Sequence, residues 1–146
     1  MAQIGSWCDM YKSPQAPQIA ELRYSGTPTG ATFTYSITVL QQTESFLSVS
    51  SGTDIDLPAG HYYAVSYPDF TRTIASRNNK VFWFVDGVQV GKEGGSDYYS
   101  GQSTDCAQAT FTLHEAGVLT LQQVAWSGAA ITLTNDAFIY IWRVPR

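Results

Sequence analysis

Near its end the chain reads Phe138, Ile139, Tyr140, Ile141, Trp142, Arg143, Val144. Successive side chains of a strand point to opposite faces, so a strand that covers a single core alternates apolar with polar residues. This stretch is apolar at both sets of alternate positions, and it therefore predicts a strand that is buried on both faces. One face is expected to cover the domain's own core. The other is expected to cover a second copy of the chain, so the sequence predicts an oligomer.

Residues 31–39 show the contrasting pattern. Apolar side chains at Ala31, Phe33, Tyr35, Ile37 and Val39 alternate with Ser and Thr in a strict period of two. Such alternation is typical of a strand with one buried face and one face in water. The last strand has no such polar set of alternate residues.

Composition limits the class of protein and its partners. A chain of 146 residues is expected to form one domain, with a core large enough to be stable without disulfides or a structural metal. Charged residues make up 14% of it, against roughly 25% in an average soluble protein. The formal net charge of −4 leaves no basic patch for a phosphate backbone, so nucleic acid is not an expected partner. No apolar run reaches the 18 or so residues of a membrane span, so no membrane partner is expected either.

Short, evenly spaced strands punctuated by turns predict an all-β sandwich or barrel. Asp86 and Gly87 join two β-rich runs, and this pair is the strongest short hairpin signal because both positions need positive φ. Asn78 and Asn79 are expected to form a turn, and residues 91–105 a long exposed loop. The predicted strands cover residues 31–39, 44–50, 55–57, 61–67, 70–75, 81–85, 88–90, 107–113, 118–126, 130–134 and 138–144.

Residues 1–30 differ in kind from the rest, with Pro and Gly interspersed among scattered apolar residues. One interpretation is a first strand over Ile19–Tyr24 behind a loose tail. The other is an arm whose anchors, Trp7, Met10 and Tyr11, dock onto a partner, because exposed aromatic side chains need a surface to cover them. The sequence leaves both open.

Three segments have recognisable patterns: Asp54–Tyr67, with its apolar strand followed by Pro-Ala-Gly-His-Tyr-Tyr, Lys80–Val90, with its Asp-Gly hairpin, and Phe111–Leu121. Together they resemble the jelly rolls of the tumour necrosis factor and complement globular-head superfamily. Val118 stands where that superfamily commonly has Asp. The resemblance covers roughly residues 31–146.

The resemblance implies an antiparallel jelly-roll sandwich of about ten strands that forms a compact homotrimer. It also implies that Tyr62, Phe138, Tyr140 and Trp142 lie at the trimer interface. The expected organisation is therefore a jelly-roll domain over residues 31–146, preceded by an N-terminal arm over residues 1–30.

Jelly rolls of this kind also occur in tailed bacteriophages. The start of the chain lacks the basic and apolar stretches of a signal peptide, so synthesis in a host cytoplasm is expected, with Cys8 and Cys106 reduced. We therefore expect a viral structural protein: a capsid decoration or cement protein on the virion surface, whose arm residues Trp7, Met10 and Tyr11 bind the major capsid protein. The alternative is a receptor- or carbohydrate-binding head of a fibre or spike, with Tyr98 and Tyr99 contacting a host glycan or receptor.

Candidate catalytic and metal-binding groups are sparse. His61 and His114 fall in different segments, with no Cys or Asp at metal-ligand spacing, and no serine has the nucleophile-elbow pattern. The carboxylates that remain open for a hydrolytic pair are those of Glu44, Asp54, Asp56, Asp97 and Glu115. No catalytic residue, metal or cofactor is expected, and the chain is not expected to be an enzyme.

Overall fold

The computed structural model describes residues 16–26, 32–67, 70–72, 78–97, 103–127, 131–133 and 137–144. Within these ranges the chain forms strands and turns, and no helix long and apolar enough to cross a membrane occurs. The strands are β1 (Gln18–Ser25), β2 (Phe33–Thr34), β3 (Ser36–Gln42), β4 (Ser48–Ser50), β5 (Asp54–Leu57), β6 (Gly60–Tyr67), β7 (Phe70–Arg72), β8 (Asn78–Val85), β9 (Val88–Asp97), β10 (Ser103–Asp105), β11 (Ala107–Leu113), β12 (Gly117–Ser127), β13 (Ile131–Leu133) and β14 (Phe138–Val144).

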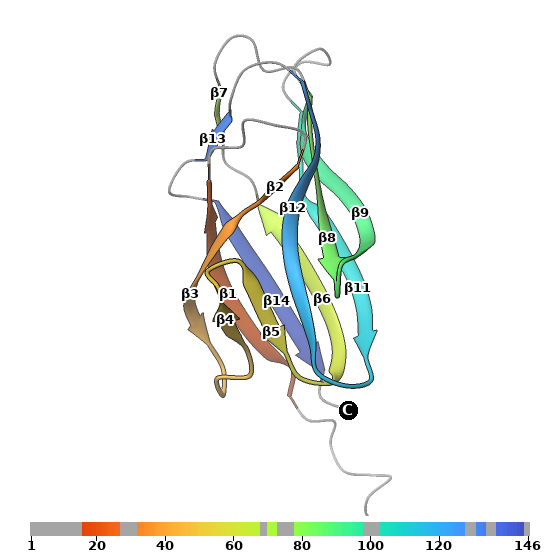
Figure 1. Cartoon of the computed structure of the whole chain (residues 1–146). Coiled ribbons are helices and arrows are strands. Elements are labelled where there is room, and N and C mark those ends of the chain that lie inside the picture. Colours follow the sequence, from red (N-terminus) through yellow and green to blue (C-terminus); the bar gives the residue numbers. More distant parts are fainter. Residues whose placement is uncertain are drawn as a thin grey trace, which may run out of the picture.

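Ten of these strands follow one hydrogen-bonded path that folds into two facing layers (Figure 1). The β14 layer has the order β3-β1-β14-β6-β11, and the β12 layer has the order β9-β8-β12-β5-β4. The layers are joined where Gln108 of β11 pairs with Lys92 of β9. This antiparallel jelly-roll sandwich confirms the predicted fold class.

Apolar side chains from alternate positions of both layers fill the space between them. Ile139 and Ile141 of β14 and Leu119 and Leu121 of β12 belong to this core, and all four side chains are fully buried. Trp83 of β8 is the largest buried side chain, and its Nε1 donates a 3.0 Å hydrogen bond to the carbonyl of Ala107 in the other layer. Burial of an aliphatic side chain such as Ile139 or Leu121 stabilises the fold by about 1.5–3 kcal/mol.

The first strand belongs to the jelly roll. β1 pairs along its length with β14 on one side and with β3 on the other, and it contributes the buried Leu22 and Tyr24 to the core. The strand interpretation of Ile19–Tyr24 is therefore correct. The packed domain begins at Gln18, rather than at residue 31 as the predicted division of the chain has it.

The alternating stretch at residues 31–39 is divided between the layers. Phe33 pairs with Gln123 of β12, whereas Ile37 pairs with Tyr24 of β1, and Tyr35 connects the two strands with its amide bonded to the Leu121 carbonyl. The predicted sidedness is confirmed, because Tyr35 and Ile37 are buried while Ser36 and Thr38 are exposed. One expected strand is thus β2 followed by β3.

The hairpin predicted at Asp86 and Gly87 is confirmed, with φ values of 47° and 80°. The turn predicted at Asn78 and Asn79 is wrong: these residues begin β8, where β9 pairs with one side and β12 with the other. Hydrogen bonding on both sides of the strand outweighs the local preference of Asn for turns.

The long loop predicted over residues 91–105 is also wrong for the part that the structure describes. β9 continues to Asp97 and pairs with β10. Gly91 makes this possible: its φ is 73°, and a Cβ there would lie 2.0 Å from the Gln108 carbonyl oxygen. A glycine is needed where β9 bends from β8 toward β11.

Candidate self-association surface

Aromatic side chains line the outer side of the β14 layer. In β14, Ile139 and Ile141 point into the core, so Phe138, Tyr140 and Trp142 point outward, and all three are half-buried. The last strand therefore has the two apolar faces that its sequence predicts. Its neighbours β6 and β1 decide what surrounds these rings.

The pairing of β6 with β14 extends this surface. Tyr63 lies opposite Trp142, Val65 opposite Tyr140, and Tyr67 opposite Phe138. The name aromatic face is used below for these residues and their apolar neighbours at the same side of the layer: Ile19, Tyr63, Val65, Tyr67, Phe138, Tyr140, Trp142 and Val144.

Ring contacts hold the aromatic face in a fixed arrangement. The centroids of Tyr63 and Trp142 are 5.4 Å apart, those of Tyr140 and Trp142 are 6.0 Å apart, and Tyr67 meets Tyr140 edge-on at 5.5 Å. Val65 points outward yet is only 1% exposed, because it lies in the middle of these rings. The side chains are thus ordered by one another before any partner arrives, which lowers the entropy cost of binding.

The aromatic face leaves large apolar groups in water. Among the residues that the structure describes, six large hydrophobic side chains are exposed, and four of them belong to this face: Ile19, Tyr63, Tyr67 and Val144. A shallow depression of about 430 Å³ lies between Tyr67, Phe138, Tyr140 and Trp142. Clustered exposed apolar groups of this kind mark an association surface, whereas scattered single ones do not.

Polar groups of β1 form one margin of the aromatic face. The Arg23 guanidinium lies 5.7 Å from the centroid of the Phe138 ring, and the Glu21 carboxylate accepts a hydrogen bond from the Gln41 amide. Partial burial, followed by the Glu21 charge, raises the pKa of Tyr140, so its phenol is neutral at physiological pH. An apolar centre with a polar margin is the usual anatomy of a protein interface.

One residue that was predicted to lie at the interface, Tyr62, is buried inside the protomer. Tyr62 is 2% exposed, its ring stacks on Phe111 at 5.2 Å, and its hydroxyl donates a 2.6 Å hydrogen bond to the Pro58 carbonyl. Its assignment to the trimer interface is therefore wrong, because the phenol is part of the protomer's own packing. The neighbouring Tyr63 takes the outward position.

The buried phenol of Tyr62 makes the stability of the fold depend on pH in the alkaline range. Burial raises the pKa of Tyr62 from 10.0 to about 12, against the opposing effect of the Arg143 guanidinium. Because the pKa in the folded chain exceeds that in the unfolded chain, this contribution to stability is complete below pH 10 and is lost as the pH rises through about 12. We expect the free energy of unfolding to fall more steeply across this window in the native chain than in Tyr62→Phe, as measured by urea unfolding. Equal slopes would contradict the burial of a neutral phenol.

Several candidate residues lie outside the described part of the chain, namely the arm residues Trp7, Met10 and Tyr11 and the loop residues Tyr98 and Tyr99. The two histidines are exposed, and His61 bonds to the Thr112 hydroxyl at 2.9 Å. Over the described ranges no group of three or more His, Cys, Asp or Glu side chains is placed to hold a metal ion.

Sequence reasoning missed Tyr63, Val65 and Tyr67 as members of the aromatic face. A signal was present, because these three apolar residues are spaced by two, whereas the alternate set contains the small Ala64 and Ser66. Small side chains suit the position where β6 packs against the core, and large ones suit the outer side.

Comparison with known proteins agrees with this architecture. No family model and no curated protein matches the chain. Crystal structures of murine APRIL at pH 8.0, 8.5 and 5.0 superpose on it with TM-scores of 0.63, 0.59 and 0.60. Each is 12% identical in sequence and covers 88% of this chain and 99% of the murine chain.

The fold is a TNF-like jelly roll. At 12% identity the likeness concerns the course of the backbone, which the three segments at residues 54–67, 80–90 and 111–121 had indicated. What the TNF-like jelly roll of this chain does must be argued from its own surface, because one fold supports many functions.

Proposed function

We propose that this chain is a structural and binding protein that acts as a homotrimer assembled through the aromatic face. The observation that carries the proposal is the concentration of exposed apolar side chains on the outer side of β14 and β6. Three copies around an axis bury this face without leaving an open end, as a closed symmetric assembly requires. The trimeric state also agrees with the resemblance of the sequence to a superfamily of trimeric jelly rolls.

The solution mass of the purified chain tests the assembly. We expect multi-angle light scattering to give three times the 16.0 kDa of one chain, at protein concentrations where a weak contact would dissociate. A mass of one chain would overturn self-association. A mass of two chains would reject the trimer.

We further propose that the trimer decorates the outer surface of a tailed-phage head and stabilises it. The sequence supports this role through its low charge and through the aromatic anchors in its first fifteen residues, which suit a mechanical attachment. A trimer that binds only the assembled shell shifts the shell toward the intact state by linkage, and three arms bind multivalently.

Capsid stability tests the decoration role. Phage heads that lack the protein are expected to release their genome at a lower temperature than heads to which the purified trimer has been added back. Equal release temperatures would reject a cement role. Loss of host adsorption without loss of head stability would instead favour the receptor-binding alternative, whose residues Tyr98 and Tyr99 would then be replaced by Ala.

A further inference from the structure

Opposite charges lie at the two margins of the aromatic face. The strand pairings place one row of residues across the β14 layer, in which each member lies opposite the next: Glu21 of β1, Tyr140 of β14, Val65 of β6, Gln108 of β11 and Lys92 of β9. Directly paired residues of neighbouring antiparallel strands point to the same side of a sheet. Both charged side chains therefore point to the outer side, Glu21 at the β1 margin and Lys92 at the β9 margin.

Neither charge is neutralised within the described part of its own chain. The ion pair that the described residues form is Lys80 with Glu93. Lys92 is exposed, and the half-buried Glu21 accepts a hydrogen bond from the neutral Gln41 amide. The row from β1 to β9 crosses four strand spacings, which is about 19 Å. Glu21 and Lys92 of one chain are therefore too far apart to pair with each other.

The adjacent rows of the aromatic face differ from the Tyr140 row in charge. One row nearer the start of β14, Arg23 lies opposite Phe138, and its guanidinium is 5.7 Å from the centroid of that ring. One row nearer the end of β14, Ile19 lies opposite Trp142, and neither is charged. Among the described residues of these three rows, the Tyr140 row is the one with an anion at one margin and a cation at the other.

A pocket beside Glu21 has the chemistry that a lysine side chain needs. Its volume is about 300 Å³, and its lining includes the Glu21 carboxylate, the apolar side chain of Ile19 and the ring of Tyr140. A lysine packs its aliphatic stem on apolar surface and leaves its ammonium for a polar or charged partner. Ile19 and Tyr140 suit the stem, and Glu21 suits the ammonium.

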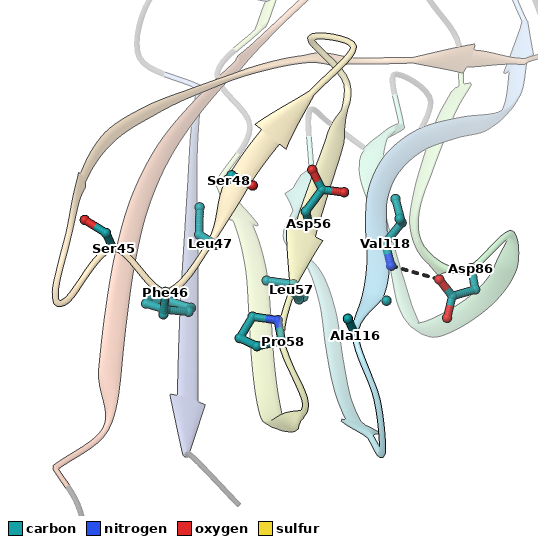
Figure 2. A pocket seen from close by; sticks show the side chains of 11 residues that line it. Ser45, Phe46, Leu47, Ser48, Asp56, Leu57, Pro58, Asp86, Ala116 and Val118 are labelled. Atoms are coloured by element: carbon teal, nitrogen blue, oxygen red, sulfur yellow. Dashed lines mark hydrogen bonds between the residues drawn. The ribbon is translucent and has the colours of Figure 1, made fainter.

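Two carboxylates of the β12 layer also lie beside a hollow, but away from the aromatic face. Asp56 and Asp86 line a groove of about 480 Å³, on either side of Val118 (Figure 2). Asp86 Oδ1 accepts a 2.8 Å hydrogen bond from the Val118 amide, so this carboxylate holds the hairpin against β12. Asp56, half-buried like Glu21, is therefore the better control for the charge of Glu21.

A ring of three copies brings the two margins together. The aromatic face is a strip centred on β14 and β6 and about 20 Å long, so an axis that buries all of it runs along these strands. Each contact in a closed ring is heterologous, so the β1 margin of one copy meets the β9 margin of the next. Rotation about an axis along the strands keeps each row at its own height. Lys92 of one copy therefore meets Glu21 of the next copy.

We propose that the Lys92 ammonium of one copy enters the pocket beside Tyr140 of the next copy and pairs with its Glu21 carboxylate. The inference rests on the proposed trimer and adds the contact that determines its arrangement. The aromatic rings supply the apolar area for association, whereas the charge pair determines which margins meet and at what height. Each pair joins two chains, so three pairs close the ring.

Zero-length carbodiimide cross-linking, followed by peptide mass spectrometry, tests the pair. The reagent joins a carboxylate to an ammonium group in direct contact with it, and the Lys80–Glu93 pair, 3.4 Å apart, controls for the reaction. Equal amounts of isotope-labelled and unlabelled full-length chains are unfolded in urea and refolded together. We expect a Lys92–Glu21 link that joins unlike chains as often as like chains, at a yield similar to that of the control.

Light scattering on the same mixture distinguishes failure of the inference from failure of the trimer. A trimer that forms the Lys80–Glu93 link and no Lys92–Glu21 link would overturn the proposed pair and leave the trimer in place. A Lys92–Glu21 link found only within single chains would also overturn it. A mass of one chain would reject the trimer, and the pair with it.

Charge reversal separates the pair from an effect of net charge. Lys92→Glu and Glu21→Lys are each expected to raise the dissociation constant of the contact at least about tenfold, because like charges then face each other. The double variant restores the attraction and is expected to return to within about threefold of the native value. Asp56→Lys and Lys80→Glu reverse the same charges on the β12 layer and are expected to leave association unchanged.

Dilution series followed by light scattering measure these dissociation constants, and a cooperative urea transition shows that each variant folds. A double variant that associates no better than the single reversals would overturn the proposal. Control variants that weaken association as much as Lys92→Glu and Glu21→Lys would overturn it as well, because net charge alone would then explain the effect. None of these measurements depends on a capsid.

Discussion

Replacement of Trp142 with glutamate is expected to dissociate the proposed trimer into folded monomers. Trp142 lies at the centre of the aromatic face, between the Tyr63 and Tyr140 rings. A central aromatic side chain of an interface contributes about 2–4 kcal/mol when truncated. Glutamate also brings a charge into a surface that must lose its water. We expect the dissociation constant of each contact to rise by a factor of about 30 to 1,000.

Light scattering and urea unfolding together check this prediction. The mass of Trp142→Glu is expected to fall to that of one chain at concentrations where the native chain is associated, while a cooperative unfolding transition remains. Val88→Glu is the matched control, because Val88 is 66% exposed at the hairpin of the β12 layer and lies outside the aromatic face. A Trp142→Glu protein with the native mass would show that the trimer forms through another surface.

The two-sided last strand shows how far sequence alone leads toward this surface. The run from Phe138 to Val144 can be identified from the local sequence as a strand with two apolar faces, because both of its alternate sets are apolar. Its outward positions, Phe138, Tyr140 and Trp142, lie where that pattern predicts. The Asp86-Gly87 hairpin is equally local, since positive φ at two adjacent residues depends on these residues alone.

Tyr62 and Tyr63 mark the limit of such reasoning. The two residues are adjacent and chemically identical, and a shift of one residue exchanges the inner and outer faces of a strand. The register of β6 is set by its partners, such as the pairing of Tyr63 with Trp142, and these partners are distant in sequence. The small residues Ala64 and Ser66 indicate which side chains of β6 point outward only once it is known which face of the strand covers the core.

The predictions for Gly91, Asn78 and Asn79 are wrong for a related reason. Glycine and asparagine favour turns in isolation, and residues 91–105 show no apolar periodicity. In the fold Gly91 allows β9 to approach the backbone of β11, and the two asparagines pair with strands on either side. Whether a glycine ends a strand or bends it depends on a backbone that arrives from elsewhere in the chain.

Replacement of Trp83 with alanine is expected to cause a large loss of stability within a single protomer. The side chain is fully buried between the layers, and its Nε1 donates to the Ala107 carbonyl across the core. Deletion of a buried Trp side chain costs about 3–5 kcal/mol through lost transfer energy and the cavity that remains. The Ala107 carbonyl also loses its buried donor. Because a domain of this size has a total stability of about 5–15 kcal/mol, much of the margin disappears.

Urea unfolding at one fixed protomer concentration measures this loss, since association also shifts the transition. Phe84→Ala is the control: Phe84 is the next residue on β8, its side chain points away from the core and is half-buried, and its loss is expected to be the smaller one. Trp83→Phe keeps most of the packing and removes the donor, so it is expected to lose about 1–3 kcal/mol and remains measurable if Trp83→Ala does not fold. A Trp83→Ala protein as stable as Phe84→Ala would contradict a core in which this indole connects the two layers.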